Sequence, residues 1–157
     1  MGILQLQKIK ELLDENKIQY RLYEHEPVFT SEQAAKVRGA KLKEGVKALV
    51  LKTDKGEFIL ALVAADRKID LQKLAKVSNN KKLKLANPEE VAKKTECEIG
   101  SVPPFGNVLG LKTFMDPSVI ENELVEFNAG LHTASIRMKS KDLVAIIKPF
   151  IVKLSLD

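Results

Sequence analysis

Lys47 is the residue that breaks the local sequence pattern most clearly. It lies in the apolar run Val46–Thr53, where strand alternation places its side chain on the same face as Leu49 and Leu51. An ammonium in such surroundings loses hydration unless it is paired or opens into a pocket, where it can stabilise charge developing in a reaction. The alternative is a structural lysine whose stem lies along the core and whose head reaches water. The residues themselves leave both interpretations open.

The segment Gly100–Gly106 is a second candidate, because it combines glycines with two prolines. It is predicted as a stiff loop between strands, since proline cannot donate to a sheet ladder. The backbone N–H groups of Gly100, Ser101 and Val102 could bind a carbonyl oxygen or an oxyanion, and Phe105 could stack on a nucleobase. A rigid turn without a ligand is the commoner use of such residues.

A third candidate lies at residues 127–135, where small and polar residues interrupt two apolar strands. Asn128, His132 and Ser135 could form a pocket wall, with His132 as a general base. A simple hairpin connection accounts for the same residues without a function.

Other chemistry has little support in the residues. The sequence has no nucleophile elbow, phosphate-binding loop, dinucleotide fingerprint or zinc-protease motif. His25, His132 and Cys97 are too few for a zinc site without distant carboxylates, so neither a metal nor another cofactor is expected. Cys97 is not expected to act as a nucleophile, because the adjacent Glu96 and Glu98 raise a thiol pKa. A single cysteine is typical of the reducing cytoplasm.

Charge and hydropathy permit a polyanionic partner. The chain of 157 residues has a net charge of +5, with basic residues gathered at positions 36–43 and 67–84. These stretches fit either a lysine-rich solvated surface or a phosphate-binding footprint. No apolar run approaches the ~20 residues of a membrane span, and no signal peptide is visible at the N-terminus.

The elements that must position these candidates follow from periodicity and capping signals. Thr30 with Gln33 and Asn87 with Glu90 predict capping boxes, and Asp54–Gly56 predicts a hairpin turn. Helices are expected at about residues 3–16, 31–37, 71–77 and 88–95. A last helix is expected after Ser140, which caps it. Phe150 lies on the apolar face of this expected helix, and Pro149 kinks or ends it. Strands are expected at residues 18–23, 46–53, 57–65, 109–114, 124–127 and 133–138. The fold class is therefore α/β, as one domain over residues 1–157 with a mixed, mostly antiparallel β-sheet flanked by helices.

In their order and spacing, several segments resemble the YbaK/ProX family of trans-acting aminoacyl-tRNA deacylases, which is related to the editing domain inserted in bacterial prolyl-tRNA synthetases. The resemblance runs through almost the whole chain and implies a mixed sheet with flanking helices around a pocket. Its segments are YEHEP at 23–27, GVKALV at 45–50, IDLQKLA at 69–75, the Gly-x-x-x-Pro loop at 100–104, NAG at 128–130 and KDL at 141–143.

The resemblance also implies roles for particular residues. Lys47 stands at the position of the family's essential lysine, and Gly100 and Pro104 match the loop that holds the terminal adenosine and the ester carbonyl. Tyr23, Gly130 and Ser135 fall where members that remove cysteine have pocket residues.

Two positions depart from the family pattern. Ser135 stands where an Asp is usual. Ala48 follows the lysine, where members that remove alanine carry Asn and members that remove cysteine carry Thr.

The activity that the resemblance implies is hydrolysis of the ester in a mischarged tRNA. The expected amino acid is small, such as Cys, Ala or Ser, on tRNA(Pro) or a related tRNA. An aminoacyl-tRNA synthetase is a possible partner, and no membrane is involved. The alternative is a non-catalytic tRNA-binding or synthetase-associated regulatory module.

Overall fold

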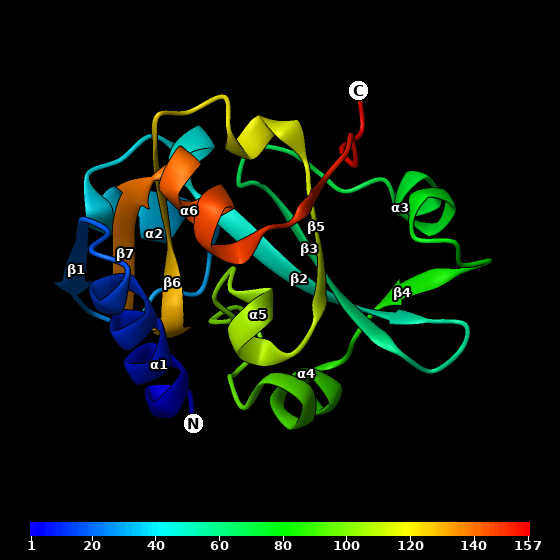
Figure 1. The fold of residues 1–157 in the computed structure, drawn as a ribbon, viewed down its shortest axis with the longest axis horizontal. Coiled ribbons are helices and arrows are strands. Elements are labelled where there is room, and N and C mark those ends of the chain that lie inside the picture. The colour runs from blue at the N-terminus through cyan, green and yellow to red at the C-terminus, as the bar shows by residue number, and fades with distance from the viewer.

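Two β-sheets organise the computed structural model, which describes residues 1–157 (Figure 1). The three-stranded sheet is antiparallel, with the order β1-β7-β6. In the five-stranded sheet, β4-β2-β3-β5-β8, β2 is antiparallel to β3 and β4, while β3, β5 and β8 are parallel. The strands are β1 (Tyr20–Glu24), β2 (Val46–Thr53), β3 (Phe58–Ala64), β4 (Leu83–Leu85), β5 (Lys112–Met115), β6 (Leu124–Leu131), β7 (Ala134–Lys139) and β8 (Phe150–Ile151).

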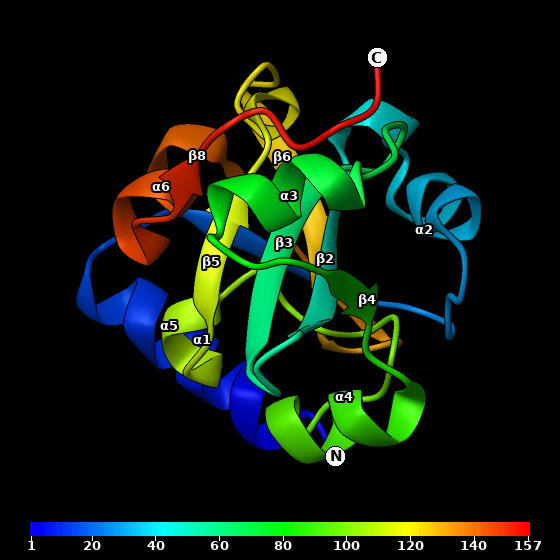
Figure 2. The ribbon, with the colours of Figure 1, turned by 90° about the vertical axis from the view of Figure 1, so that its right-hand side faces the viewer.

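Six α-helices and two short 3₁₀ helices surround the sheets, and α3 covers the outer face of the five-stranded sheet (Figure 2). None of the helices is long and apolar enough to cross a membrane. The helices are α1 (Ile3–Glu15), α2 (Ser31–Arg38), α3 (Leu71–Val77), α4 (Pro88–Thr95), α5 (Gly106–Leu109), α6 (Ser140–Ile147), η1 (Leu42–Glu44) and η2 (Pro117–Val119). The expected α/β class with mixed, mostly antiparallel strands is confirmed, although the strands divide between two sheets.

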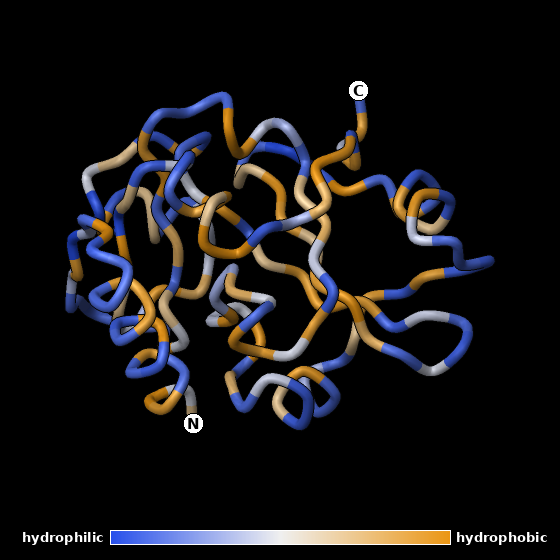
Figure 3. Tube along the Cα trace, viewed as in Figure 1, coloured by the Kyte–Doolittle hydropathy of each residue, from blue (hydrophilic) through white to orange (hydrophobic).

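Strand alternation divides the apolar residues of β2 between two cores. Val46 and Val50 belong to the larger cluster, which also holds Phe127 of β6 and Ile9 of α1. Leu51 belongs to a smaller cluster under α3. The apolar colour in Figure 3 accordingly follows the central strands, while hydrophilic colour gathers in the outer turns.

The local signals for helices are largely confirmed. Both capping boxes form, with Thr30 Oγ1 accepting from Gln33 N at 3.1 Å and Asn87 Oδ1 accepting from Glu90 N at 2.8 Å. The last helix ends at Ile147, before Pro149. Ser140 is not its cap, however, because its hydroxyl donates to the carbonyl of Asn122.

Three expectations for the second half of the chain are wrong in detail. Residues 106–109 form α5, so β5 starts at Lys112 instead of Leu109. β6 continues past Phe127 to Leu131, with an irregularity after Asn128. Phe150 lies in β8, where it pairs with Phe114, because Pro149 separates it from the helix.

An incomplete strand pairing in the five-stranded sheet prepares a site. β4 pairs only with Leu51–Thr53, at one end of β2 (Figure 2). Residues 47–49 therefore have β3 on one side and no strand on the other. An open strand edge inside a fold leaves backbone groups for a ligand.

The burial of Cys97 yields a first prediction. Its side chain is fully buried in the larger core, and burial raises the pKa of the thiol to about 11. We expect a thiol reagent to label the native protein only as fast as the protein unfolds, and Cys97→Ser to retain turnover. Labelling of urea-unfolded protein is the control. Rapid labelling of the native state, or loss of turnover in a folded Cys97→Ser variant, would contradict this account.

Candidate active site

The pocket at the open edge of β2 has a volume of about 260 Å³. Its walls come from α2, η1, the first half of β2, the segment around Ala86, the loop at residues 99–102 and β6. Most of its lining is apolar, and its charged side chains are those of Arg38, Lys41, Lys47 and Glu126. An apolar cleft with a few polar groups is the usual form of a small-molecule site.

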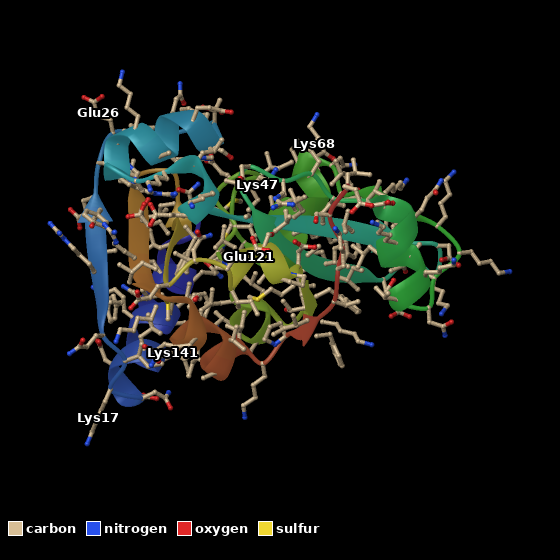
Figure 4. The ribbon with its side chains drawn as sticks, turned by 90° about the horizontal axis from the view of Figure 1, so that it is seen from above. Lys17, Glu26, Lys47, Lys68, Glu121 and Lys141 are labelled. Carbon is tan, nitrogen blue, oxygen red and sulfur yellow. The ribbon has the colours of Figure 1, made fainter.

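Lys47 lines this pocket from β2, as the pattern of the sequence suggests. The side chain is half-buried, and Nζ donates to the carbonyl oxygen of Arg67 at 2.5 Å. Burial lowers the pKa of its ammonium, while the nearby carboxylates of Asp66 and Glu32 oppose that shift. In Figure 4, Lys47 lies over the middle of the molecule, whereas Lys17 and Lys68 project from the surface. The lysine head is thus held in place, with N–H groups left for a ligand.

Arg38 and Asn128 form a hydrogen-bonded polar wall of the pocket. Its Nε donates to Ser135 Oγ at 2.9 Å, and its Nη2 donates to Asn128 Oδ1 at 2.8 Å. Burial lowers the pKa of the guanidinium, and the charge of Glu126 partly offsets this. The planar fork of arginine suits such fixed, multiple hydrogen bonds.

Asn128 joins this wall to the proline-containing loop, because its Nδ2 donates to the carbonyl of Gly100 at 2.7 Å. Ser101 strengthens the join by accepting from Gly130 N at 3.1 Å. The N–H of Ser101 donates to the backbone carbonyl of Glu98. The expectation that this N–H binds an oxyanion is therefore wrong. The N–H groups of Gly100 and Val102 donate to no protein acceptor, and both residues line the pocket.

Glu126 is the most unusual group in the site. Its side chain is 1% exposed, and neither carboxylate oxygen accepts a hydrogen bond. Arg137 Nη1 lies 3.7 Å from Oε1, so the pair interacts by charge only. Burial raises the pKa of the carboxyl group, against the opposing effects of Arg38 and Arg137.

Phe105 and Pro104 do not line the pocket. Phe105 is fully buried, and its ring meets Phe127 edge-on with centroids 5.7 Å apart. The expectation that Phe105 stacks on a base is therefore wrong. Pro104, the preceding residue, is also buried, and its fixed φ angle stiffens the loop.

Gly130 and Tyr23 also lie outside the pocket lining. Gly130 has φ +99°, and a Cβ there would approach the Gly2 carbonyl to 2.8 Å, so its role is to admit the N-terminal segment. Tyr23 pairs with Ser135 across β1 and β7, and its ring contacts the guanidinium of Arg21.

His132 and Ser135 support the site from outside it. Nδ1 of His132 faces the Val28 carbonyl at 2.9 Å, and Nε2 lies 3.4 Å from the Glu98 carboxylate. Both nitrogens thus have partners, which disfavours His132 as a general base. Ser135 is fully buried, and its hydroxyl contacts Arg38 and His25.

Arg38, Glu126 and Phe29 line the pocket and were not singled out as site residues from the sequence. Phe29 is 69% exposed at the pocket rim, and its ring packs on His132 with centroids 4.6 Å apart. A signal for Glu126 did exist, because it interrupts an apolar strand just as Lys47 does. Arg38 offered no such signal, since it lies in an ordinary basic stretch.

The comparison with protein families decides the assignment. Residues 25–146 match the model of the aminoacyl-tRNA editing domain. The chain belongs to this family.

Relatives of the editing domain support the same assignment. The Multifunctional Ser/Thr-tRNA deacylase ProXp-y of Escherichia coli (strain K12) is 35% identical over an alignment of 156 residues that covers 96% of this chain and 93% of the relative. The Prolyl-tRNA editing protein ProX of Acetoanaerobium sticklandii is 30% identical over 141 residues, covering 87% and 86%. A crystal structure described as a candidate trans-editing enzyme for prolyl tRNA synthetase superposes with a TM-score of 0.85 at 27% identity, over 98% of each chain. The family expected from the sequence is confirmed, and with it the general activity, hydrolysis of an aminoacyl-tRNA ester.

The buried carboxyl of Glu126 yields a prediction about stability and pH. A carboxyl group whose pKa is raised on folding stabilises the folded state at low pH and loses that contribution as pH rises through the raised value. The charged groups that act on it are Arg38, Arg137 and Glu44. Glu126→Gln should therefore gain melting temperature over the wild type near pH 7, and gain less near pH 4.

The matched control is Glu123→Gln, which removes an exposed carboxylate from the segment just before the same strand. Its melting temperature should follow the wild type at both pH values. A Glu126→Gln variant whose melting temperature is shifted equally at both pH values would show that the carboxyl group is not perturbed by burial.

Proposed function

We propose that the editing-domain pocket hydrolyses the ester between a small amino acid and the terminal adenosine of a mischarged tRNA. The observation that carries this proposal is that Lys47, Gly100 and Val102 line one pocket. The N–H groups of Gly100 and Val102 donate to no acceptor in the protein. These are the groups that ester hydrolysis requires, because negative charge develops on the carbonyl oxygen. Water adds to the carbonyl carbon, the bond to the ribose oxygen breaks, and the ribose hydroxyl leaves with a proton.

Each group has a specific part in the proposed reaction. The N–H groups of Gly100 and Val102 stabilise the oxyanion, and Lys47 contributes a charge that Arg67 holds in position. No histidine lines the pocket. A hydroxyl of the terminal ribose therefore directs the attacking water in the proposed reaction.

Pocket size supports a small amino acid such as serine, alanine or cysteine. The pocket of about 260 Å³ has to hold the ribose end of the adenosine as well as the amino acid, which leaves room for a small side chain only. A pocket of this kind excludes large amino acids but separates neighbours that differ by one methylene by only about 1–3 kcal/mol. The E. coli relative at 35% identity is named for serine and threonine, which lie in this size class.

Phe29 is our candidate for binding the terminal adenine. It is exposed at the pocket rim and supported from behind by His132, so it offers a preformed surface for stacking. It takes the role that the sequence suggested for Phe105.

Substitution of Lys47 tests the proposed chemistry. Lys47→Ala should lower the deacylation rate by about 10²–10³, the usual effect of removing one oxyanion donor. Lys47→Arg should also fail, because a planar fork does not occupy the place of a compact ammonium. The rates are measured on a panel of mischarged tRNAs that includes seryl- and alanyl-tRNA, together with melting temperatures.

Lys141→Ala is the matched control, because Lys141 is an exposed lysine in α6. Its turnover should equal that of the wild type. Normal turnover by Lys47→Ala would instead support the structural lysine, whereas absence of turnover by the wild type on every tRNA of the panel would support the non-catalytic module.

Substitution of Phe29 tests the adenine site. Base–aromatic stacking contributes about 1–3 kcal/mol per base, so Phe29→Ala should raise KM for the mischarged tRNA by about 5- to 150-fold. Phe150→Ala is the control, since Phe150 is 58% exposed and does not line the pocket. Equal KM values for the two variants would remove Phe29 from the binding site.

A further inference from the structure

The carboxylate of Glu126 is an acceptor without a donor. It is the only acidic side chain that lines the pocket. Arg38 directs its hydrogen bonds to Ser135 and Asn128 instead, and the 3.7 Å separation from Arg137 is too long for one. Buried carboxylates in proteins are normally hydrogen-bonded, and leaving one without donors is costly. A group in this state points to a ligand that brings the missing donor.

The fold places Glu126 in the pocket by strand alternation. Its neighbours Val125 and Phe127 are buried in the larger core, so the side chain of Glu126 lies on the opposite face of β6, with Asn128. Gly45, the residue just before β2, forms a parallel bridge with Glu126. The carboxylate therefore lies where the first residues of β2 and the end of α2 converge.

The chemistry of an aminoacyl ester supplies one matching donor. Every such ester carries an α-ammonium, and in the small amino acids discussed above it is the only cation. The pocket has one anionic side chain, while its cations, Lys47, Arg38 and Lys41, suit the carbonyl oxygen and phosphates. We propose that Glu126 binds the α-ammonium of the aminoacyl group and thereby positions the ester. This inference rests on the proposed function.

The geometry explains how such binding orients the reacting bond. Glu126 and Asn128 are two residues apart on β6, and Asn128 holds the carbonyl of Gly100. The ammonium site and the N–H groups of Gly100 and Val102 are thus linked by one strand and one hydrogen bond. An ester anchored at its ammonium presents its carbonyl to these N–H groups in a fixed orientation.

A consequence for substrate selection follows. An ester whose α-amino group is acylated, as in peptidyl-tRNA, keeps one neutral amide N–H but brings no cation to Glu126. A buried carboxylate left without its counter-charge is a strong basis for rejection. Glu126 therefore makes the enzyme selective for free aminoacyl esters.

The test compares esters that differ in the α-substituent alone. The substrates are alanyl-tRNA and lactyl-tRNA, in which a hydroxyl replaces the ammonium, and seryl-tRNA with its α-hydroxy counterpart, glyceroyl-tRNA. Wild type should hydrolyse each amino ester faster than its hydroxy counterpart, by kcat/KM. In Glu126→Gln this preference should fall by about 10- to 100-fold, the usual effect of one charged hydrogen bond. Because the preference is a ratio within one preparation, a change in the folded fraction cancels.

Glu123→Gln is the control and should keep the wild-type preference. A selective loss by Glu126→Gln on seryl-tRNA alone would show that the carboxylate reads the side-chain hydroxyl, which overturns the proposal. An equal loss on amino and hydroxy esters, or no loss on either, would also overturn it. If the wild type hydrolyses none of the four esters, that is a distinct result, because it contradicts the proposed function itself.

Discussion

The hydrogen bonds of Arg38 hold together the parts on which the pocket depends. One guanidinium at the end of α2 bonds Ser135 of β7 and Asn128 of β6, and Asn128 in turn bonds Gly100. Three elements and the loop therefore share one partly buried polar network, in which a missing hydrogen bond costs more than it would in water. The network fixes the position of α2 and β6 relative to the loop that carries the proposed oxyanion site.

The short pairing of β4 is the second constraint. A full-length β4 would cover residues 47–49 of β2, and no pocket would form beside Lys47. Because β4 stops after pairing with Leu51–Thr53, the open edge faces α2 and the loop. β2 is thus both a core element, through Val46 and Val50, and a wall of the pocket.

Local features of this fold could be predicted from the sequence. The capping boxes of Thr30 and Asn87 and the β2–β3 hairpin depend on neighbouring residues, and they formed as expected. The place of Lys47 in a pocket could also be predicted, because a charged residue in an apolar strand stands out from its immediate neighbours. The burial of Phe105 could not be predicted, since it depends on Phe127 from a distant strand. Arg38 was missed for the same reason, because its partners Asn128 and Ser135 are 90 and 97 residues away.

The most direct measurement is a crystal structure with a stable analogue of the tRNA terminus, 3′-seryl-amido-3′-deoxyadenosine. We expect the seryl group in the pocket, with its carbonyl oxygen within hydrogen-bond distance of the Gly100 and Val102 N–H groups and its ammonium on Glu126. The adenine should lie on Phe29. An analogue bound elsewhere on the protein, or bound in the pocket with its ammonium turned away from Glu126 and its carbonyl away from the loop, would contradict the account.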